Sequence, residues 1–473
     1  MASANISFDT IPSSLRKPGK YFEFNTKLAV RTLPTNAQTV LILGQRLAMG
    51  TVAALTPTQV FSGDEAALYF GAGSLAHRAA LAAITANKYV ALTVIGIDDA
   101  AAAVVATGKA TFTGPATADG AYALLIGKDR VDIAVSSGAA AADVAQQFAD
   151  AIAQQPALPV TAAAAAGVLT LTAKNKGAAG NAIALSQLGQ TAGVSAVLTA
   201  FSGGLNDPDI SLALAAVFGA QYNIYSSSWT AQPQLTALRT HLDSISSALE
   251  QRPAIGVAGT GGTLATTTTL AGQLDSGRIT IGWHPGSISL PAEIAAAYAA
   301  VIASEEDPAR PLNTLALTGL DVTPVPSRPG RTEQESVLYN GVTPFEIGPG
   351  DVVQIVRSIS TYTKDAQGID DPALLDLTTI RTLDYVRKAC LQRIALRFPR
   401  DKLSTRTPPK VRSELLDVLK KIEDLEIIEN VDDNKAMLIC ERDEQNVNQL
   451  NGAIPADVVN GLHIFAGRID LLL

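Results

Sequence analysis

The spacing of hydrophobic positions changes several times along the chain, and these changes outline its parts. Residues 39–46 and 89–97 are continuous apolar runs of the kind that are buried on both faces of a parallel sheet. Residues 64–87, which lie between them, have apolar positions at helical spacing with an interruption at residues 71–73. These segments together predict a β-α-β unit.

Residues 103–203 break this alternation. Short apolar segments bounded by Gly, Pro, Asn or Asp follow one another there, around a single helical pattern at residues 140–154. Closely spaced segments of this kind are typical of antiparallel strands, so we predict a β-rich domain that is inserted into the first one and faces solvent. Residues 174–181 are Gly-rich and basic, but no Lys-Ser/Thr pair opens a helix there. We interpret them as a loop tip.

Strand and helix patterns alternate again over residues 204–320. The predicted elements are strands at 222–227, 254–262 and 278–286 and helices at 233–250, 263–275 and 291–304. The first and last of these helices begin with proline, which suits a first helical turn. Alternation of this kind predicts one parallel sheet with helices on both faces, shared by residues 38–102 and 204–320.

The rest of the chain is predicted to be a linker and an α+β domain. Residues 321–338 are Pro-rich and extended in character. Within residues 339–473, a β-rich apolar run from Val352 to Tyr362 precedes apolar positions at helical spacing from Leu377 to Ile394. The further elements expected are a helix at 411–423 and strands at 425–429, 436–442 and 463–473. A strand in this last position can pair with another subunit.

Residues 1–37 are predicted to be an extended arm. Apolar and aromatic side chains are scattered there among Pro12, Pro18, Gly19 and polar residues, so the segment cannot build a core of its own. An arm that is buried on another surface explains these side chains, and a loose terminus is the alternative. The predicted fold class is therefore an α/β core sheet with helices on both faces, an inserted β-rich domain and an α+β C-terminal domain, with an extended N-terminal arm.

Composition and charge restrict the classes of molecule that the protein is expected to bind. Of 473 residues, 47% are hydrophobic and only 17% charged, with a mean hydropathy of +0.20, which favours burial of surface against copies of the same chain. A net charge of −8 argues against nucleic acid as a partner. No apolar run reaches the roughly 18 residues of a membrane span, and the first residues lack a secretory signal. Two cysteines make no disulfide framework, as expected of a protein in a reducing compartment.

Motifs for catalysis are missing. The four histidines lie in separate segments, with no H-x-x-x-H or H-E-x-x-H, and no G-x-S-x-G is present. The glycines of residues 256–262 have the wrong spacing for a dinucleotide fingerprint, and the acidic residues 365–371 do not match an EF-hand. We therefore predict a non-enzyme without metal or cofactor. An α/β hydrolase stays open as an alternative, because catalytic triads assemble from distant positions.

The chain resembles the contractile tail sheath proteins of bacteriophages, most closely those of Mu-like phages. The segments that carry the resemblance are 11–25, 40–46, 171–183, 340–363 and 374–387. The resemblance implies a structural virion protein that stacks in rings around a tail tube, contracts, and drives the tube through the host envelope. It implies a homo-oligomer that also contacts the tube, baseplate and tail terminator proteins, and that assembles in the host cytoplasm without nucleic acid or membrane insertion. A virion protein that binds the host surface through its β-rich insert is a further alternative.

The resemblance also assigns candidate contact residues. Terminal arms of sheath proteins pair with neighbouring subunits, so the candidates for intersubunit strands are Ile6, Phe8, Ile11, Tyr21, Phe22, Phe24, Ile464, Phe465, Ile469 and Leu471. The candidates for contact with the tube are the basic residues of the long C-terminal helix, namely Arg381, Arg387, Lys388 and Arg393. Ionic contacts of this kind can release during sliding, and a solvated helix face is the alternative explanation for the four charges.

Overall fold

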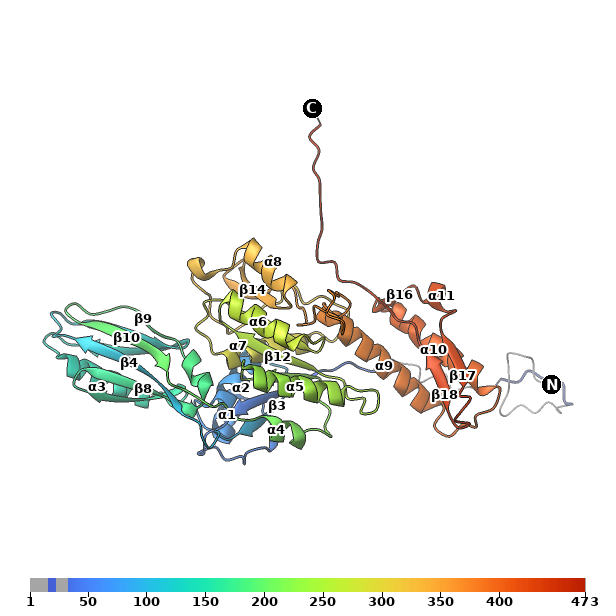
Figure 1. The fold of residues 1–473 in the computed structure, drawn as a ribbon, viewed down its shortest axis with the longest axis horizontal. Helices are drawn as coiled ribbons and strands as arrows, with labels where there is room; N and C mark the ends of the chain where they lie inside the picture. The colour runs from blue at the N-terminus through green and yellow to red at the C-terminus, as the bar shows by residue number, and fades with distance from the viewer. Residues whose placement is uncertain (1–15, 23–32, 473) are drawn as a thin grey trace. The chain divides into compact units, whose positions relative to one another are not determined.

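A computed structural model describes residues 16–22 and 33–472. The chain forms two compact units. The larger unit contains Asn36–Tyr385, Glu426–Glu429 and Ala456–Leu473, and the smaller unit contains Val386–Leu425 and Asn430–Pro455 together with the described residues before Asn36. The mixed α/β class predicted from the sequence is confirmed (Figure 1). Among the described residues, no helix is long and apolar enough to cross a bilayer.

An eight-stranded sheet forms the centre of the larger unit, in the order β15-β14-β13-β12-β11-β1-β3-β2. Its strands are β1 (Thr39–Gln45), β2 (Pro57–Gln59), β3 (Ala91–Ile97), β11 (Ile224–Ser227), β12 (Ile255–Thr260), β13 (Ile279–Trp283), β14 (Thr343–Gly348) and β15 (Val352–Ile355). Six neighbouring strands, β14 to β3, run parallel, and the two edge strands β2 and β15 are antiparallel to them. The two separate α/β stretches of the sequence thus meet in one sheet, where β1 pairs with β11.

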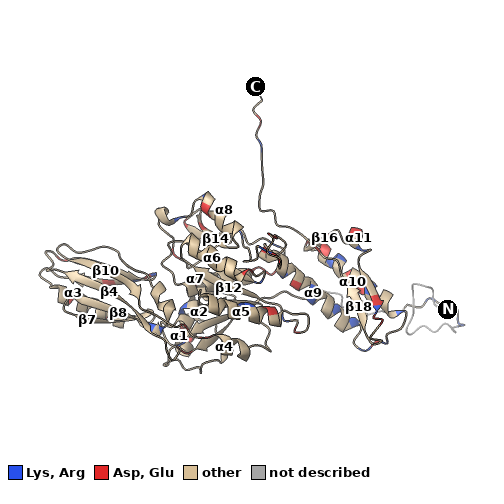
Figure 2. Cartoon of the chain, in the orientation of Figure 1, with Lys and Arg blue, Asp and Glu red and all other residues tan. Residues whose placement is uncertain are grey.

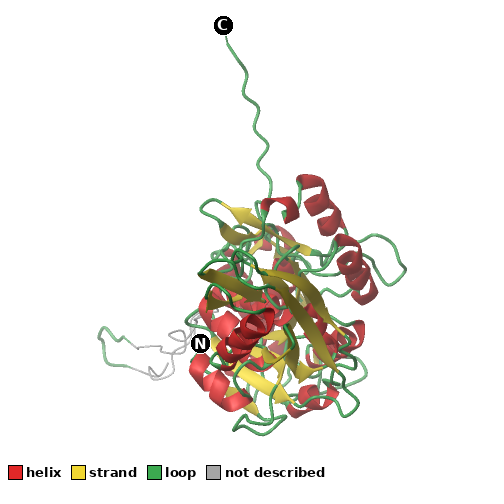
Figure 3. Ribbon diagram, turned by 90° about the vertical axis from the view of Figure 1, so that its left-hand side faces the viewer, coloured by secondary structure: helices red, strands yellow, loops and turns green. Residues whose placement is uncertain are grey.

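Two apolar cores cover the two faces of this sheet, and Figure 3 shows helices on either side of the strands. The first is formed by α1 (Gly63–Phe70), α2 (Leu75–Ala86) and α7 (Pro291–Ser304), and the second by α4 (Ser211–Ala216), α5 (Gln232–Ile245), α6 (Leu264–Leu274) and α8 (Arg331–Tyr339). Strand side chains alternate between the faces, so Val40 and Ile42 reach the first core while Leu41 and Leu43 reach the second. This two-sided burial explains the continuous apolar run of β1.

The inserted domain lies between β3 and β11 and consists of antiparallel strands. Its elements are β4 (Val105–Thr113), β5 (Gly120–Ile126), β6 (Asp129–Val135), α3 (Ala141–Ala153), β7 (Val160–Ala165), β8 (Val168–Lys176), the 3-10 helix Ala178–Ala182, β9 (Leu185–Gln187) and β10 (Ser195–Ser202). Phe112, Tyr122 and Phe148 pack ring against ring in its core, with centroids 5.4–5.8 Å apart. The strands carry few charged residues (Figure 2).

The predicted linker and the start of the C-terminal domain differ from the structure. Residues 325–327 form a short 3-10 turn, and α8 follows where an extended connector was expected. Strands β14 and β15 extend the central sheet, because β14 pairs in parallel with β13 through Gly282↔Thr343. Phe345 is fully buried there. The sequence showed these strands but not the sheet to which they belong.

The smaller unit is built on two helices rich in charge (Figure 2). Helix α9 (Leu377–Arg397) contributes its second half to this unit, and α10 (Thr407–Glu423), α11 (Val431–Asn434) and the hairpin β17 (Ile439–Arg442) with β18 (Leu450–Ala453) complete it. Val411, Leu415, Val418, Leu419 and Ile422 form the buried face of α10. The chain then returns to the larger unit, where β16 (Ile428–Glu429) pairs with β19 (Asp457–Val458).

Residues 459–472 contain neither helix nor strand, although a strand was predicted from residue 463 onward. Figure 1 shows this segment as an extended stretch of chain without a neighbour along most of its length. A β-strand is defined by pairing, and no described residue pairs with this one. The apolar pattern is therefore present, but no strand among the described residues pairs with it.

Candidate assembly surfaces

The C-terminal segment exposes a series of large apolar side chains. Ile464 is 80% exposed and Ile469 99%, and Phe465, Leu471 and Leu472 are equally open. Within the described chain, no backbone–backbone hydrogen bond involves residues 464–472. Burial of one such side chain is worth about 1.5–3 kcal/mol. The segment therefore has both free backbone groups and apolar surface to offer a partner.

The N-terminal candidates are described only in part. Phe22 is exposed, and Tyr21 is nearly half exposed with its hydroxyl donating to the carbonyl of Lys17 at 3.1 Å. The other candidates of the arm, Ile6, Phe8, Ile11 and Phe24, lie outside the described residues. The assignment of the arm to an intersubunit strand stays a prediction.

Two of the four basic candidates on α9 are buried. Arg381 donates to the carbonyl of Glu305 at 2.5 Å, and burial lowers its pKa to about 10. Arg393 lies between Glu414 at 3.0 Å and Asp417 at 2.6 Å, both on α10. We expected these two arginines on an exposed face, and the structure instead buries each of them against a partner from another part of the sequence. We therefore do not retain them as tube contacts.

Arg387 and Lys388 are half-buried and remain candidates. The Lys388 ammonium donates to the carbonyl of Thr35 at 2.7 Å. This bond links the helix to the end of the predicted N-terminal arm, residues 1–37.

Buried ion pairs connect the inserted domain to the sheet domain, which is the eight-stranded sheet of the larger unit with the helices on its two faces. Arg78 on α2 is 2% exposed and Glu293 on α7 is 1% exposed, and their side chains meet at 2.6 Å. The same guanidinium contacts Asp129 of β6 at 2.6 Å, and Lys128 lies 3.6 Å from Glu293. Partners on both sides compensate each charge, which is the condition for burying an ion pair without a large penalty.

Residues 174–181 belong to this junction and are not the predicted loop tip. The Asn175 side chain is buried, where it accepts from the backbone N–H of Leu75 at 3.0 Å and donates to the carbonyl of Arg46 at 3.0 Å. Lys174 donates to the carbonyls of Ala72 and Pro156 at 3.1 and 2.6 Å. The Gly-rich, basic composition of residues 174–181 predicts a solvated loop, because the sequence does not show that these side chains bind backbone carbonyl groups from distant parts of the chain.

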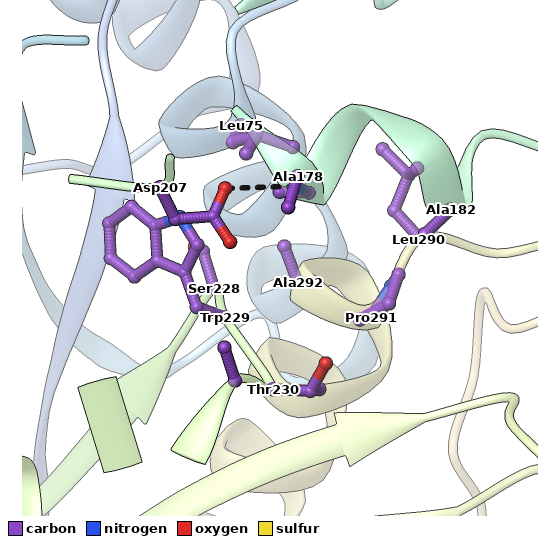
Figure 4. A pocket seen from close by; sticks show the side chains of 12 residues that line it. Leu75, Ala178, Ala182, Asp207, Ser228, Trp229, Thr230, Leu290, Pro291 and Ala292 are labelled. Atoms are coloured by element: carbon purple, nitrogen blue, oxygen red, sulfur yellow. Dashed lines mark hydrogen bonds between the residues drawn. The ribbon is translucent and has the colours of Figure 1, made fainter. Parts of the chain in front are cut away.

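A small cavity of about 170 Å³ opens beside this junction, at the start of α7 (Figure 4). Its lining is mostly apolar, with Asp207 as its charged group. One Asp207 oxygen accepts from the backbone N–H of Ala179 at 2.9 Å, and burial raises the pKa of this carboxyl. The carboxylate thus caps the 3-10 helix. Among the described residues that line the cavity there is no histidine, cysteine or lysine.

The histidines have structural contacts. His77 Nδ1 accepts from the N–H of Gly73 at 3.0 Å, and burial lowers its pKa to about 4. His284 Nε2 lies 2.8 Å from the carbonyl of Asp321, while Ser287 and Ser289 donate directly to the Asp321 carboxylate. In a catalytic triad the histidine stands between the serine and the acid, so this cluster has a different order. In the described ranges, no three His, Cys, Asp or Glu side chains group as metal ligands.

A network of polar side chains surrounds His463, where the C-terminal segment begins. The Asn313 amide donates to His463 Nδ1 at 2.9 Å, and His463 Nε2 lies 3.5 Å from Asp376 Oδ1. Arg357 binds both oxygens of Asp376, at 2.8 and 2.7 Å. Burial, and after it the charge of Arg357, lowers the pKa of His463. The imidazole is therefore neutral at pH 7 and able to accept from Asn313.

Comparison with known proteins places these features in a family. Residues 203–361 match the central domain of phage tail sheath proteins, and residues 370–471 match their C-terminal domain. The Mu-like prophage FluMu tail sheath protein of Haemophilus influenzae is 33% identical over 99% of this chain and 100% of its own length.

Solved structures share the fold. A sheath tail protein from Desulfitobacterium hafniense has a TM-score of 0.52 at 16% identity, covering 94% of this chain and 97% of that one. The sheath of an extracellular contractile injection system in its contracted state has a TM-score of 0.50 at 9% identity, covering 97% and 98%. The chain therefore belongs to the phage tail sheath protein family, as a structural subunit of a contractile phage tail.

Proposed function

We propose that this chain polymerises around a tail tube through its terminal segments, and that contraction of the polymer drives the tube through the host envelope. The observation that carries the proposal is the extended C-terminal segment, whose apolar side chains are exposed and which pairs with no strand among the described residues. A second copy that adds this segment to one of its sheets would satisfy the backbone groups and bury the side chains together.

Strand addition suits a polymer that must move. Hydrogen bonds along an added strand depend little on side chains and can persist while the domains beside them rotate. In this proposal Tyr21 and Phe22 belong to a second exchanged segment, and the inserted domain faces outward. Arg387 and Lys388 are the proposed contacts with the tube, since partly exposed charges make ionic contacts that can release. Baseplate and terminator proteins are the proposed partners at the two ends.

Electron microscopy of the purified chain tests the proposal. We expect tubes or stacked rings from the full chain, and folded but unassembled protein after deletion of residues 464–473 or of residues 1–24. Arg468→Ala is the matched control, because Arg468 is exposed and its contact in the structure is Asp470 of the same segment at 2.6 Å. Tubes of normal length from the chain without residues 464–473 would refute the role of the segment.

A further inference from the structure

Among the described residues, the hydrogen bonds of the C-terminal segment with the rest of the larger unit end at His463. The N–H of Val459 donates to the carbonyl of Ile427 at 3.3 Å, and Gly461 lies close against Pro311. The side chain of His463 is still largely buried, whereas the next residue is mostly exposed. From this point the remaining residues, 464–473, span at most about 36 Å when fully extended.

His463 joins the segment to two separated parts of the larger unit. Asn313 follows α7 in the sequence, and Asp376 immediately precedes α9. Asp376 is itself fixed by its paired bonds to Arg357 and by a bridge between its backbone and that of Ile359. The ring of His463 is therefore held by groups whose own positions are determined by the fold.

We infer that His463 is a positioning residue for assembly, which fixes where the C-terminal segment leaves its own chain and so where it reaches the next copy. The inference rests on the function proposed above and names the residue that directs the exchanged segment. Residues 459–463 are ordered before assembly because of this anchor. Order that exists before binding lowers the conformational entropy lost on binding, so the anchored segment pairs more readily than a free one.

The anchor has a defined dependence on protonation. The charged groups that face His463 are Arg357 and Asp376, and Asn313 is neutral. Only the neutral ring accepts from Asn313 at Nδ1. Since the pKa of His463 is lowered in the anchored state, the anchor is intact above the ordinary value of about 6.5 and weakens as the pH falls through the lowered value.

Hydrogen exchange of the unassembled chain tests the anchor directly. In His463→Ala we expect the amides of residues 459 and 463 to exchange about tenfold faster at pH 7, as for the loss of one hydrogen bond to the segment. In His463→Asn the amide oxygen replaces Nδ1 as an acceptor, so we expect exchange within about twofold of the original chain. Arg468→Ala, which changes the free part of the segment, is expected to leave both amides unaffected.

Two further measurements separate positioning from simple packing. After correction for intrinsic rates, protection of these amides is expected to fall between pH 7 and pH 5 in the original chain but not in His463→Asn. Tube formation, followed by light scattering and microscopy, is expected to be at least about threefold slower in His463→Ala and restored in His463→Asn.

Faster exchange in His463→Ala with an unchanged rate of tube formation would overturn the positioning role. Unchanged exchange would overturn the anchor, whether or not tubes form. A full chain that forms no tubes at any concentration would instead refute the proposed function, while the exchange data would still decide whether His463 holds the segment.

Discussion

The inserted domain and the C-terminal segment are attached to the same sheet domain in opposite ways. The insert is fixed by buried charges, with Arg78 between Glu293 and Asp129, and by the buried amide of Asn175. The C-terminal segment is held at His463 and then exposes one apolar side chain after another. The insert has its partners on its own chain, whereas the apolar side chains of the C-terminal segment are exposed, as the proposed exchange with another subunit requires.

This difference indicates which contacts we expect to stay the same during assembly and which we expect to change. A buried ion pair is expensive to separate, because each partner left alone is an uncompensated charge in a poorly solvated place. Exposed apolar side chains lose nothing when the monomer forms and gain when a second chain covers them. We therefore expect the insert to move with the sheet domain as one body, and the C-terminal segment to change its surroundings on assembly.

The largest effect is expected from breaking the insert junction. Arg78→Ala leaves Glu293 buried without its main partner and is expected to lower the free energy of unfolding by about 3–5 kcal/mol. Chemical denaturation of the unassembled chain, followed by circular dichroism, measures this loss.

The control for this prediction is Arg130→Ala, which removes the exposed pair with Asp132 and should leave the unfolding curve unchanged. The double variant Arg78→Met with Glu293→Gln removes both charges and should lose less stability than Arg78→Ala. Equal unfolding curves for Arg78→Ala and Arg130→Ala would contradict the account of the junction.

A smaller effect is expected from pH at the neighbouring histidine. The pKa of His77 is about 4 in the folded chain, below its ordinary value of 6.5, so the unfolded chain binds the proton more tightly. The contribution of neutral His77 to the free energy of unfolding is therefore fully present above pH 6.5. It decreases by roughly 3 kcal/mol as the pH falls to 4.

Replacement of His77 by Asn isolates this contribution. Asparagine can keep an acceptor for the Gly73 N–H but does not titrate. The difference in unfolding free energy between pH 7 and pH 4 should shrink by about 2–3 kcal/mol relative to the original chain. An identical pH dependence in both chains would show that His77 is not buried in its neutral form.

The smallest effect on stability is expected in the C-terminal segment. Ile469→Ser and Phe465→Ser change exposed side chains and should alter the unfolding free energy of the monomer by less than about 0.5 kcal/mol. The same substitutions should reduce tube formation, which microscopy and sedimentation measure. A monomer that is clearly destabilised by either change would indicate that the segment packs on its own chain, and the contrast with the insert would fail.

The local elements of this protein follow from its sequence, and so does its family. The double-sided apolar runs of β1 and β3, the proline at the start of α7 and the glycine interruption between α1 and α2 all depend on neighbouring residues. Periodicity and turn chemistry act over short distances, so a single sequence is enough to read them.

The tertiary structure alone decided which polar residues are buried and which strands pair. Arg381 and Arg393 became internal because a distant carbonyl and the carboxylates of α10 meet them. Residues 174–181 joined two domains through distant backbone groups, and β14 and β15 entered the central sheet. Among the described residues, 463–472 joined no strand in spite of their strand pattern. Burial of charge and pairing of strands both require a partner from elsewhere in the chain or from another chain, and the residues themselves do not specify where that partner lies.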